Sequence, residues 1–158
     1  MNKMMLTALA SILLTITPWA QEAAPLPPPP DKDPFVGTWQ SNIDKSRPRL
    51  SKRDASYTRT ITRDGDDRVF SSRIGISHPS ENHYRIRCDG LFHGVPFGSL
   101  SCKFSAANVI EGVTKQLDTQ TLYWSEEVSA DGREVKITSY KNSGRTKVTS
   151  IWVLDRVK

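Results

Sequence analysis

Short runs of alternating hydrophobic and polar residues, separated by turn signals, cover the chain from residue 37 onward. In the run 68–77, for example, Phe70 and Ile74 share one face while Arg73 lies on the other. This period of two is typical of half-buried β-strands, and no apolar stripe with a 3.6-residue period is long enough for a helix. The pattern predicts nine strands, at 37–43, 55–63, 68–77, 82–88, 99–104, 109–115, 121–128, 133–140 and 146–157.

Short connections with turn-forming residues link these predicted strands, as at 64–67, 129–132 and 142–144. Short links favour antiparallel neighbours, and a long antiparallel sheet hides its edges by closing on itself. We therefore expect an all-β fold, an antiparallel up-and-down β-barrel of about eight to nine strands.

The alternation leaves open which strand face lines the barrel. In the last run, Trp152 and Leu154 share one face and Ile151 and Val153 share the other, so both faces carry apolar residues. Strand geometry also allows only one of two adjacent aromatic residues in 121–128 to point inward. The candidates for a ligand-lining role are Tyr57, Phe70, Phe92, Phe97, Tyr123, Trp124 and Trp152.

The first 34 residues differ from the rest in composition. In residues 1–20, Lys3 precedes an apolar run that breaks at Pro18, which is the layout of a secretory signal peptide. The run is shorter than the roughly 20 residues of a membrane-spanning helix, so we expect cleavage, no transmembrane segment afterwards, and a periplasmic or secreted protein. Residues 21–34 are proline-rich and predict an extended linker. The barrel domain is then 35–158.

The chain is basic, with 22 Lys and Arg against 17 Asp and Glu and a formal net charge of +5. Its densest positive cluster comprises Arg47, Arg49, Lys52 and Arg53, which is typical of a solvated loop rather than of a nucleic-acid interface. Composition therefore gives no reason to expect a nucleic-acid partner.

Cys88 and Cys102 are the two cysteines of the chain. Thiols in an exported protein are usually oxidised, and this spacing is not the Cys-x-x-Cys of redox enzymes. We expect a structural disulfide that contributes about 3 kcal/mol by restricting the unfolded chain. The segment 90–98 between the cysteines is rich in aromatic and glycine residues, and it predicts a loop that either closes the barrel mouth or caps the core.

No catalytic or metal-binding pattern is present in the sequence. His78, His83 and His93 lack a second pair of ligands at zinc-like spacing, and no serine stands in a Gly-x-Ser-x-Gly motif. Glu126 and Glu127 are adjacent on a predicted strand and point to opposite faces, so they cannot act as a carboxylate pair. We expect neither an enzyme nor a cofactor or metal site.

The stretch Asp-Pro-Phe-Val-Gly-Thr-Trp at 33–39, followed by Asn-Ile-Asp-Lys-Ser at 42–46, resembles the opening of small exported bacterial lipocalin-like proteins of the calycin type. The stretches 109–112, 128–138 and 152–156 are similar to the same proteins. The resemblance implies an up-and-down barrel that encloses a small apolar ligand. It also implies a structural role for Gly37 and Trp39, with Trp39 packed under Arg156.

Two functions stay open at this point. The first is a protein that binds a small apolar or amphipathic ligand inside the barrel. The second is a barrel with a solid core that acts through its outer surface, as an envelope-associated partner-binding or inhibitor protein. A continuous apolar cavity of roughly 300 Å³ or more favours the first function, and a packed interior favours the second.

Overall fold

The computed structural model describes residues 33–49, 51, 56–75, 79–117 and 120–157. Within these ranges the chain forms ten strands: β1 (Gly37–Arg47), β2 (Thr58–Asp64), β3 (Asp67–Ile74), β4 (Ser80–Ile86), β5 (Asp89–Val95), β6 (Gly98–Ala106), β7 (Val109–Gln116), β8 (Thr121–Val128), β9 (Glu134–Tyr140) and β10 (Val148–Arg156). The described ranges contain no helix with the length and apolar character needed to cross a membrane. The predicted signal peptide and most of the predicted linker lie outside the described residues.

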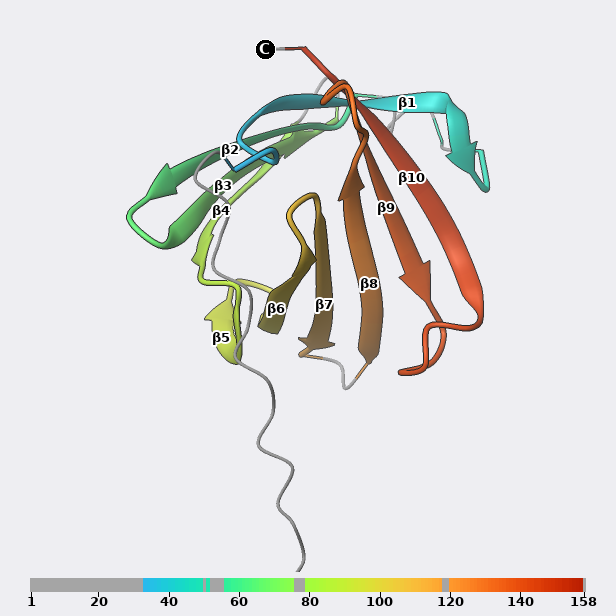
Figure 1. Cartoon of the computed structure of the whole chain (residues 1–158). Helices are drawn as coiled ribbons and strands as arrows, with labels where there is room; N and C mark the ends of the chain where they lie inside the picture. Colours follow the sequence, from blue (N-terminus) through green and yellow to red (C-terminus); the bar gives the residue numbers. More distant parts are fainter. Residues whose placement is uncertain (1–32, 50, 52–55, 76–78, 118–119, 158) are drawn as a thin grey trace, which may run out of the picture.

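All ten strands belong to one antiparallel sheet, in the order β4-β3-β2-β1-β10-β9-β8-β7-β6-β5. Strand β1 pairs with both β2 and β10, so the first and last strands are hydrogen-bonded neighbours. The two ends of the order are β4 and β5, which follow each other in the chain. Figure 1 shows the sheet wrapped into a near-closed barrel, with β1 crossing one end and β5 to β10 running side by side.

The prediction of an antiparallel all-β barrel is confirmed, but the expected count of eight to nine strands is wrong. The segment 90–98, predicted as a loop, holds most of β5, which pairs with β6 from Asp89↔Lys103 to Val95↔Gly98 around a turn at 96–97. The glycines of β5 and its Asp89-Gly90 pair are turn signals in a sequence, and for this reason the strand was not predicted. Gly90 does adopt a positive φ of 84°, but it does so at a β-bulge inside β5.

Two large aromatic side chains are fully buried at the end of the barrel where β1 begins and β10 ends. Phe35 and Trp39 have no exposed surface there, and the indole N–H of Trp39 donates to the carbonyl oxygen of Phe35 at 2.9 Å. The guanidinium carbon of Arg156 lies 4.0 Å from the centroid of the Trp39 ring. The same guanidinium donates to the carbonyl oxygens of Pro34, Val36 and Gly132. Arg156 therefore holds the entry segment and the β8–β9 connection against the end of the barrel.

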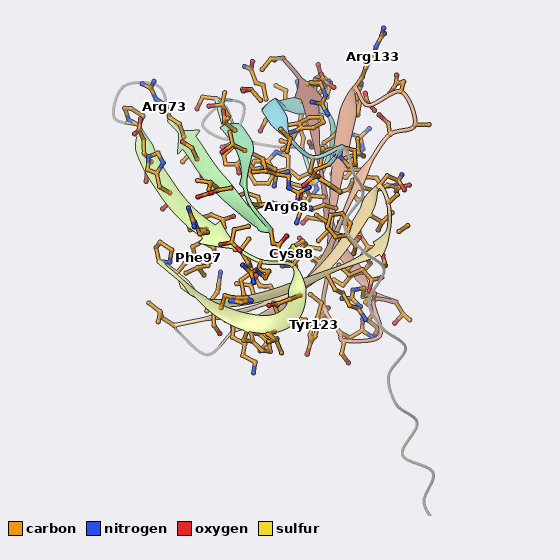
Figure 2. The ribbon with its side chains drawn as sticks, turned by 60° about the vertical axis from the view of Figure 1, so that its left-hand side comes forward. Arg68, Arg73, Cys88, Phe97, Tyr123 and Arg133 are labelled. Carbon is orange, nitrogen blue, oxygen red and sulfur yellow. A yellow bond between two sulfur atoms is a disulfide. The ribbon has the colours of Figure 1, made fainter. Side chains whose placement is uncertain are left out.

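A buried ion pair adds Asp33 to this end of the barrel. The Arg68 Nη2 and Asp33 Oδ2 atoms are 2.6 Å apart, and both side chains are almost fully buried. The Arg68 guanidinium also lies 4.4 Å from the centroid of the Phe104 ring. Figure 2 shows Arg68 inside the barrel, whereas Arg133 points away from it. The packed structure thus includes Asp33, at the edge of the predicted linker.

The predicted disulfide between Cys88 and Cys102 is present. Cys88 lies in the connection from β4 to β5, and Cys102 lies on β6 with 2% of its surface exposed. The bond therefore ties β6 to the connection between the two strands that end the sheet order.

Gly112 determines where a large aromatic side chain of the next strand can lie. Gly112 on β7 is paired with Trp124 on β8, and a β-carbon built at Gly112 would come within 2.0 Å of the Trp124 ring. The indole can lie flat over the β7 backbone only because residue 112 has no side chain.

The contact between Trp39 and Arg156 generates a stability prediction. Trp39→Ala should lower the free energy of unfolding by about 3–5 kcal/mol because it leaves a large cavity in the core. Arg156→Ala should lower it less, by about 1–3 kcal/mol, through the loss of three partly buried hydrogen bonds. Urea unfolding measures both, and Arg133→Ala, at an exposed site, is the control. Unchanged melting temperatures in both variants would contradict a structural role for the contact between Trp39 and Arg156.

A second prediction concerns Gly112. Gly112→Ala should destabilise the protein by about 1–3 kcal/mol, because the new methyl group must push the Trp124 ring out of its place. The matched control is Gly94→Ala, since nothing lies within 4 Å of a β-carbon built at Gly94, and its effect should stay within about 1 kcal/mol. Equal unfolding midpoints for the two variants would show that the Trp124 ring can move without cost.

Candidate functional site

The inner faces of β3, β4 and β6 to β10 enclose a cavity of about 230 Å³. Alternation along each strand supplies every second side chain to this space. The residues around it are predominantly apolar, with few polar groups among them. They are Phe70, Tyr84, Ile86, Cys88, Phe97, Leu100, Cys102, Ile110, Thr114, Leu122, Trp124, Glu126, Ile137, Ser139 and Trp152.

The cavity runs from the packed end of the barrel to the opposite, open end. At the inner end, Ile110 is only 3% exposed. At the other end, Leu122 at the start of β8 is 39% exposed. Phe97, in the turn between β5 and β6, lies at the same end and is labelled in Figure 2. Among the described residues, the lining of the cavity therefore extends from the buried Ile110 to the partly exposed Leu122.

The structure brings four of the seven predicted lining residues together around the cavity, namely Phe70, Phe97, Trp124 and Trp152. Tyr57 lies behind them, with its ring centroid 4.7 Å from that of Trp152.

Two of the predicted lining residues lie away from the cavity. Phe92 on β5 is 48% exposed, and the Lys115 Nζ atom lies 4.1 Å from the centroid of its ring. Tyr123 is the outward neighbour of Trp124, and it pairs with Val113 and Tyr140. Alternation therefore assigns the inward position to Trp124.

The aromatic side chains around the cavity are fixed by contacts with one another. The Phe70 and Tyr84 rings are stacked with their centroids 4.8 Å apart. The edge of Phe97 meets Tyr84 at an interplanar angle of 90°. These contacts hold the walls in one arrangement before any ligand enters.

Both tryptophans of the cavity have their polar atom satisfied by the protein. The Trp124 indole N–H donates to the Thr114 hydroxyl, and the Trp152 indole N–H donates to the Ser41 hydroxyl, each at 3.0 Å. Because these donors are already used, the two indoles offer a ligand only their apolar ring surfaces.

A charged pair lies at the inner part of the cavity. The Arg59 Nη1 and Nη2 atoms donate to the two carboxylate oxygens of Glu126 at 2.8 and 2.9 Å. The side chains are 5% and 11% exposed. Burial alone would lower the pKa of Arg59, but the attraction of Glu126 outweighs it and the pKa is raised. Arg59 therefore stays charged at physiological pH, held by the two hydrogen bonds to Glu126.

Two tyrosines near this pair are neutral. Burial raises the pKa of both Tyr57 and Tyr84, and the nearby Arg59 offsets this effect only in part. Their phenol groups therefore keep their protons throughout the physiological range.

Sequence reasoning missed several residues of this site, among them Arg59, Tyr84 and Glu126. It placed Glu126 and Glu127 on opposite faces but gave neither a role. A signal was present, because Arg59 alternates in phase with Ile61 and Glu126 with Trp124. A charge of each sign in an inward-facing apolar row is expected only when the two are paired. The sequence does not show that Arg59 pairs with Glu126, because the two strands come together only when the sheet closes.

Among the described residues, no three His, Cys, Asp or Glu side chains cluster in a way that could hold a metal ion. His83 is exposed near Glu81, and the His93 ring nitrogen lies 2.9 Å from the Asp89 carboxylate. His78 lies outside the described residues, as do Lys52 and Arg53 of the basic cluster.

No family model matches this sequence, and no curated protein matches it. Solved structures do match its fold. A fatty acid transporter, REP1-NXSQ, superposes with a TM-score of 0.53 and 16% identity, over 78% of this chain and 96% of its own. Secretory abundant heat soluble protein 4 from Ramazzottius varieornatus gives 0.54 and 11% identity, over 80% and 97%. A further secretory abundant heat soluble protein from that organism gives 0.54 and 11% identity, over 79% and 96%.

These identities are too low to carry function, but the superpositions cover nearly the whole of each neighbour. They establish that the chain has the near-closed β-barrel architecture shared by these proteins, which is consistent with a lipocalin-like fold.

Proposed function

We propose that this protein binds a small apolar or amphipathic molecule inside its barrel. The observation that carries the proposal is the cavity of about 230 Å³ among aromatic and aliphatic side chains. Largely apolar pockets with a few convergent polar groups are the usual form of small-molecule sites. Here the few polar side chains are those of Thr114, Glu126 and Ser139, together with the phenol of Tyr84.

The size of the cavity restricts the ligand. Its volume is below the roughly 300–1,000 Å³ of pockets that bury drug-sized molecules, so we infer a short chain or a small ring system. The exposed Leu122 at the open end allows part of a longer ligand to remain outside. The volume is below the roughly 300 Å³ set above for a ligand-binding barrel. The interior is nevertheless hollow rather than filled, and this hollow is what favours ligand binding over a partner-binding barrel with a packed core.

The proposal extends to the cellular location of the protein. The apolar run in residues 1–20 has the layout of an export signal, and the disulfide between Cys88 and Cys102 is typical of an oxidising compartment. We infer an exported, lipocalin-like bacterial protein that takes up its ligand in the periplasm or outside the cell. The description of one structural neighbour as a fatty acid transporter fits a hydrophobic ligand.

Filling the cavity tests the proposal. The neutral dye N-phenyl-1-naphthylamine should bind the wild-type protein saturably, with a rise in its fluorescence. Ser139→Trp places an indole in the cavity and should weaken binding by at least tenfold, which corresponds to about 1.4 kcal/mol. The matched control is Lys136→Trp, on the exposed face of the same strand, which should bind as the wild type does. Equal dye affinity in Ser139→Trp and the wild type, with both folded by circular dichroism, would refute the cavity as the site.

A further inference from the structure

We propose that the cavity selects apolar ligands that end in a hydroxyl group and discriminates against ligands that end in a carboxylate. This inference rests on the proposed function and specifies the chemical class of the ligand. It follows from where the two members of the Arg59–Glu126 pair lie relative to the cavity.

The charge that faces the cavity is negative. Glu126 is one of the residues around the cavity, whereas Arg59 is not. The Arg59 guanidinium reaches Glu126 from strand β2 across the interior, with its carbon 5.9 Å from the centroid of the Phe70 ring. Both of its terminal nitrogens are engaged by Glu126. The cation is thus screened from a ligand by its own carboxylate partner.

No other cation compensates. Among the described residues that surround the cavity, Glu126 is the one charged side chain, and no Lys, Arg or His is present. A ligand carboxylate would therefore be buried without a positive partner, which is strongly unfavourable. It would also lie near a second carboxylate, and like charges at a shared site oppose the ionisation of both groups.

The same arrangement suits a hydrogen-bond donor. Two carboxylate oxygens can accept about four hydrogen bonds, and Arg59 donates one to each oxygen of Glu126. The remaining acceptor positions are available to a hydroxyl proton. Glu126 is paired with Ile110 on one side and Ile137 on the other, so this acceptor lies deep in an apolar layer.

The depth of Glu126 orients the ligand. The hydroxyl group binds at the inner end, and the apolar part extends past Trp124 toward Leu122 at the open end. Ser139, paired with Trp124 one step nearer that end, offers a second polar group along the same wall. An alcohol with a short chain matches this sequence of polar and apolar positions.

Decanol and decanoate test the inference, because they share one chain length and differ only in the polar end. At neutral pH, each is titrated against wild-type protein carrying N-phenyl-1-naphthylamine. We expect decanol to displace half of the dye at a concentration at least tenfold lower than decanoate does. If decanoate is as effective as decanol, or if neither displaces bound dye, the inference is wrong while the proposed function stands. If the dye itself does not bind the wild type, the proposed function fails.

Glu126→Gln tests the cause of the selectivity. Glutamine keeps an acceptor oxygen and nearly the same shape but removes the negative charge, so Arg59 becomes an unneutralised cation. Decanoate should then gain at least tenfold in affinity relative to decanol. The matched control is Glu127→Gln, whose residue pairs with Lys136 at 2.7 Å on the outer face and whose ligand ratio should equal that of the wild type. An unchanged ratio in folded Glu126→Gln overturns the assignment. If that variant does not fold, the wild-type comparison of decanol with decanoate decides alone.

Discussion

The position of the Arg156 guanidinium over the Trp39 indole is the contact on which the remaining architecture depends. Trp39 lies near the start of the first strand and Arg156 ends the last one, and the two residues are partners in the β1–β10 register. An up-and-down sheet can close by pairing its first and last strands, and here this pairing is made and is covered by a cation–π contact. The interruption in the sheet therefore falls between β4 and β5, where a disulfide on the adjoining connection ties the chain to β6.

Filling one end of the barrel determines where a cavity can exist. Phe35 and Trp39 occupy the interior at the closed end without exposed surface, and the cavity extends from there toward the other end. There the walls are held apart by aromatic contacts, and the close approach of Trp124 to the Gly112 backbone keeps that indole against the wall. The cavity is thus a consequence of unequal packing along one barrel: Phe35 and Trp39 fill one end, whereas the aromatic side chains toward the other end line the wall.

The alternation of residues was enough to predict the class of fold, because a period of two is a local property of each strand. Strand β5 was missed because its glycines and its Asp-Gly pair have the composition of a turn, and only pairing with β6 makes this segment extended. The inward position of Trp124 rather than Tyr123 was open for a similar reason, since burial depends on which face the closed sheet encloses. The Arg59–Glu126 pair joins residues 67 positions apart on strands that are not neighbours in the sheet, and no local pattern specifies such a contact.

The same pair raises a question of energetics that packing alone does not answer. Two charges taken out of water lose hydration that their attraction only partly restores, and well-packed apolar residues in their place are often neutral or stabilising by about 1–4 kcal/mol. Stability therefore gives little reason for an ion pair across this barrel. Binding of a polar ligand group would be a reason for the pair. A carboxylate held at both oxygens by a guanidinium cannot rotate, so its remaining lone pairs keep a fixed direction. In the proposed ligand site, whose indole donors are already used within the protein, such a carboxylate is an acceptor suited to the polar end of an otherwise apolar ligand.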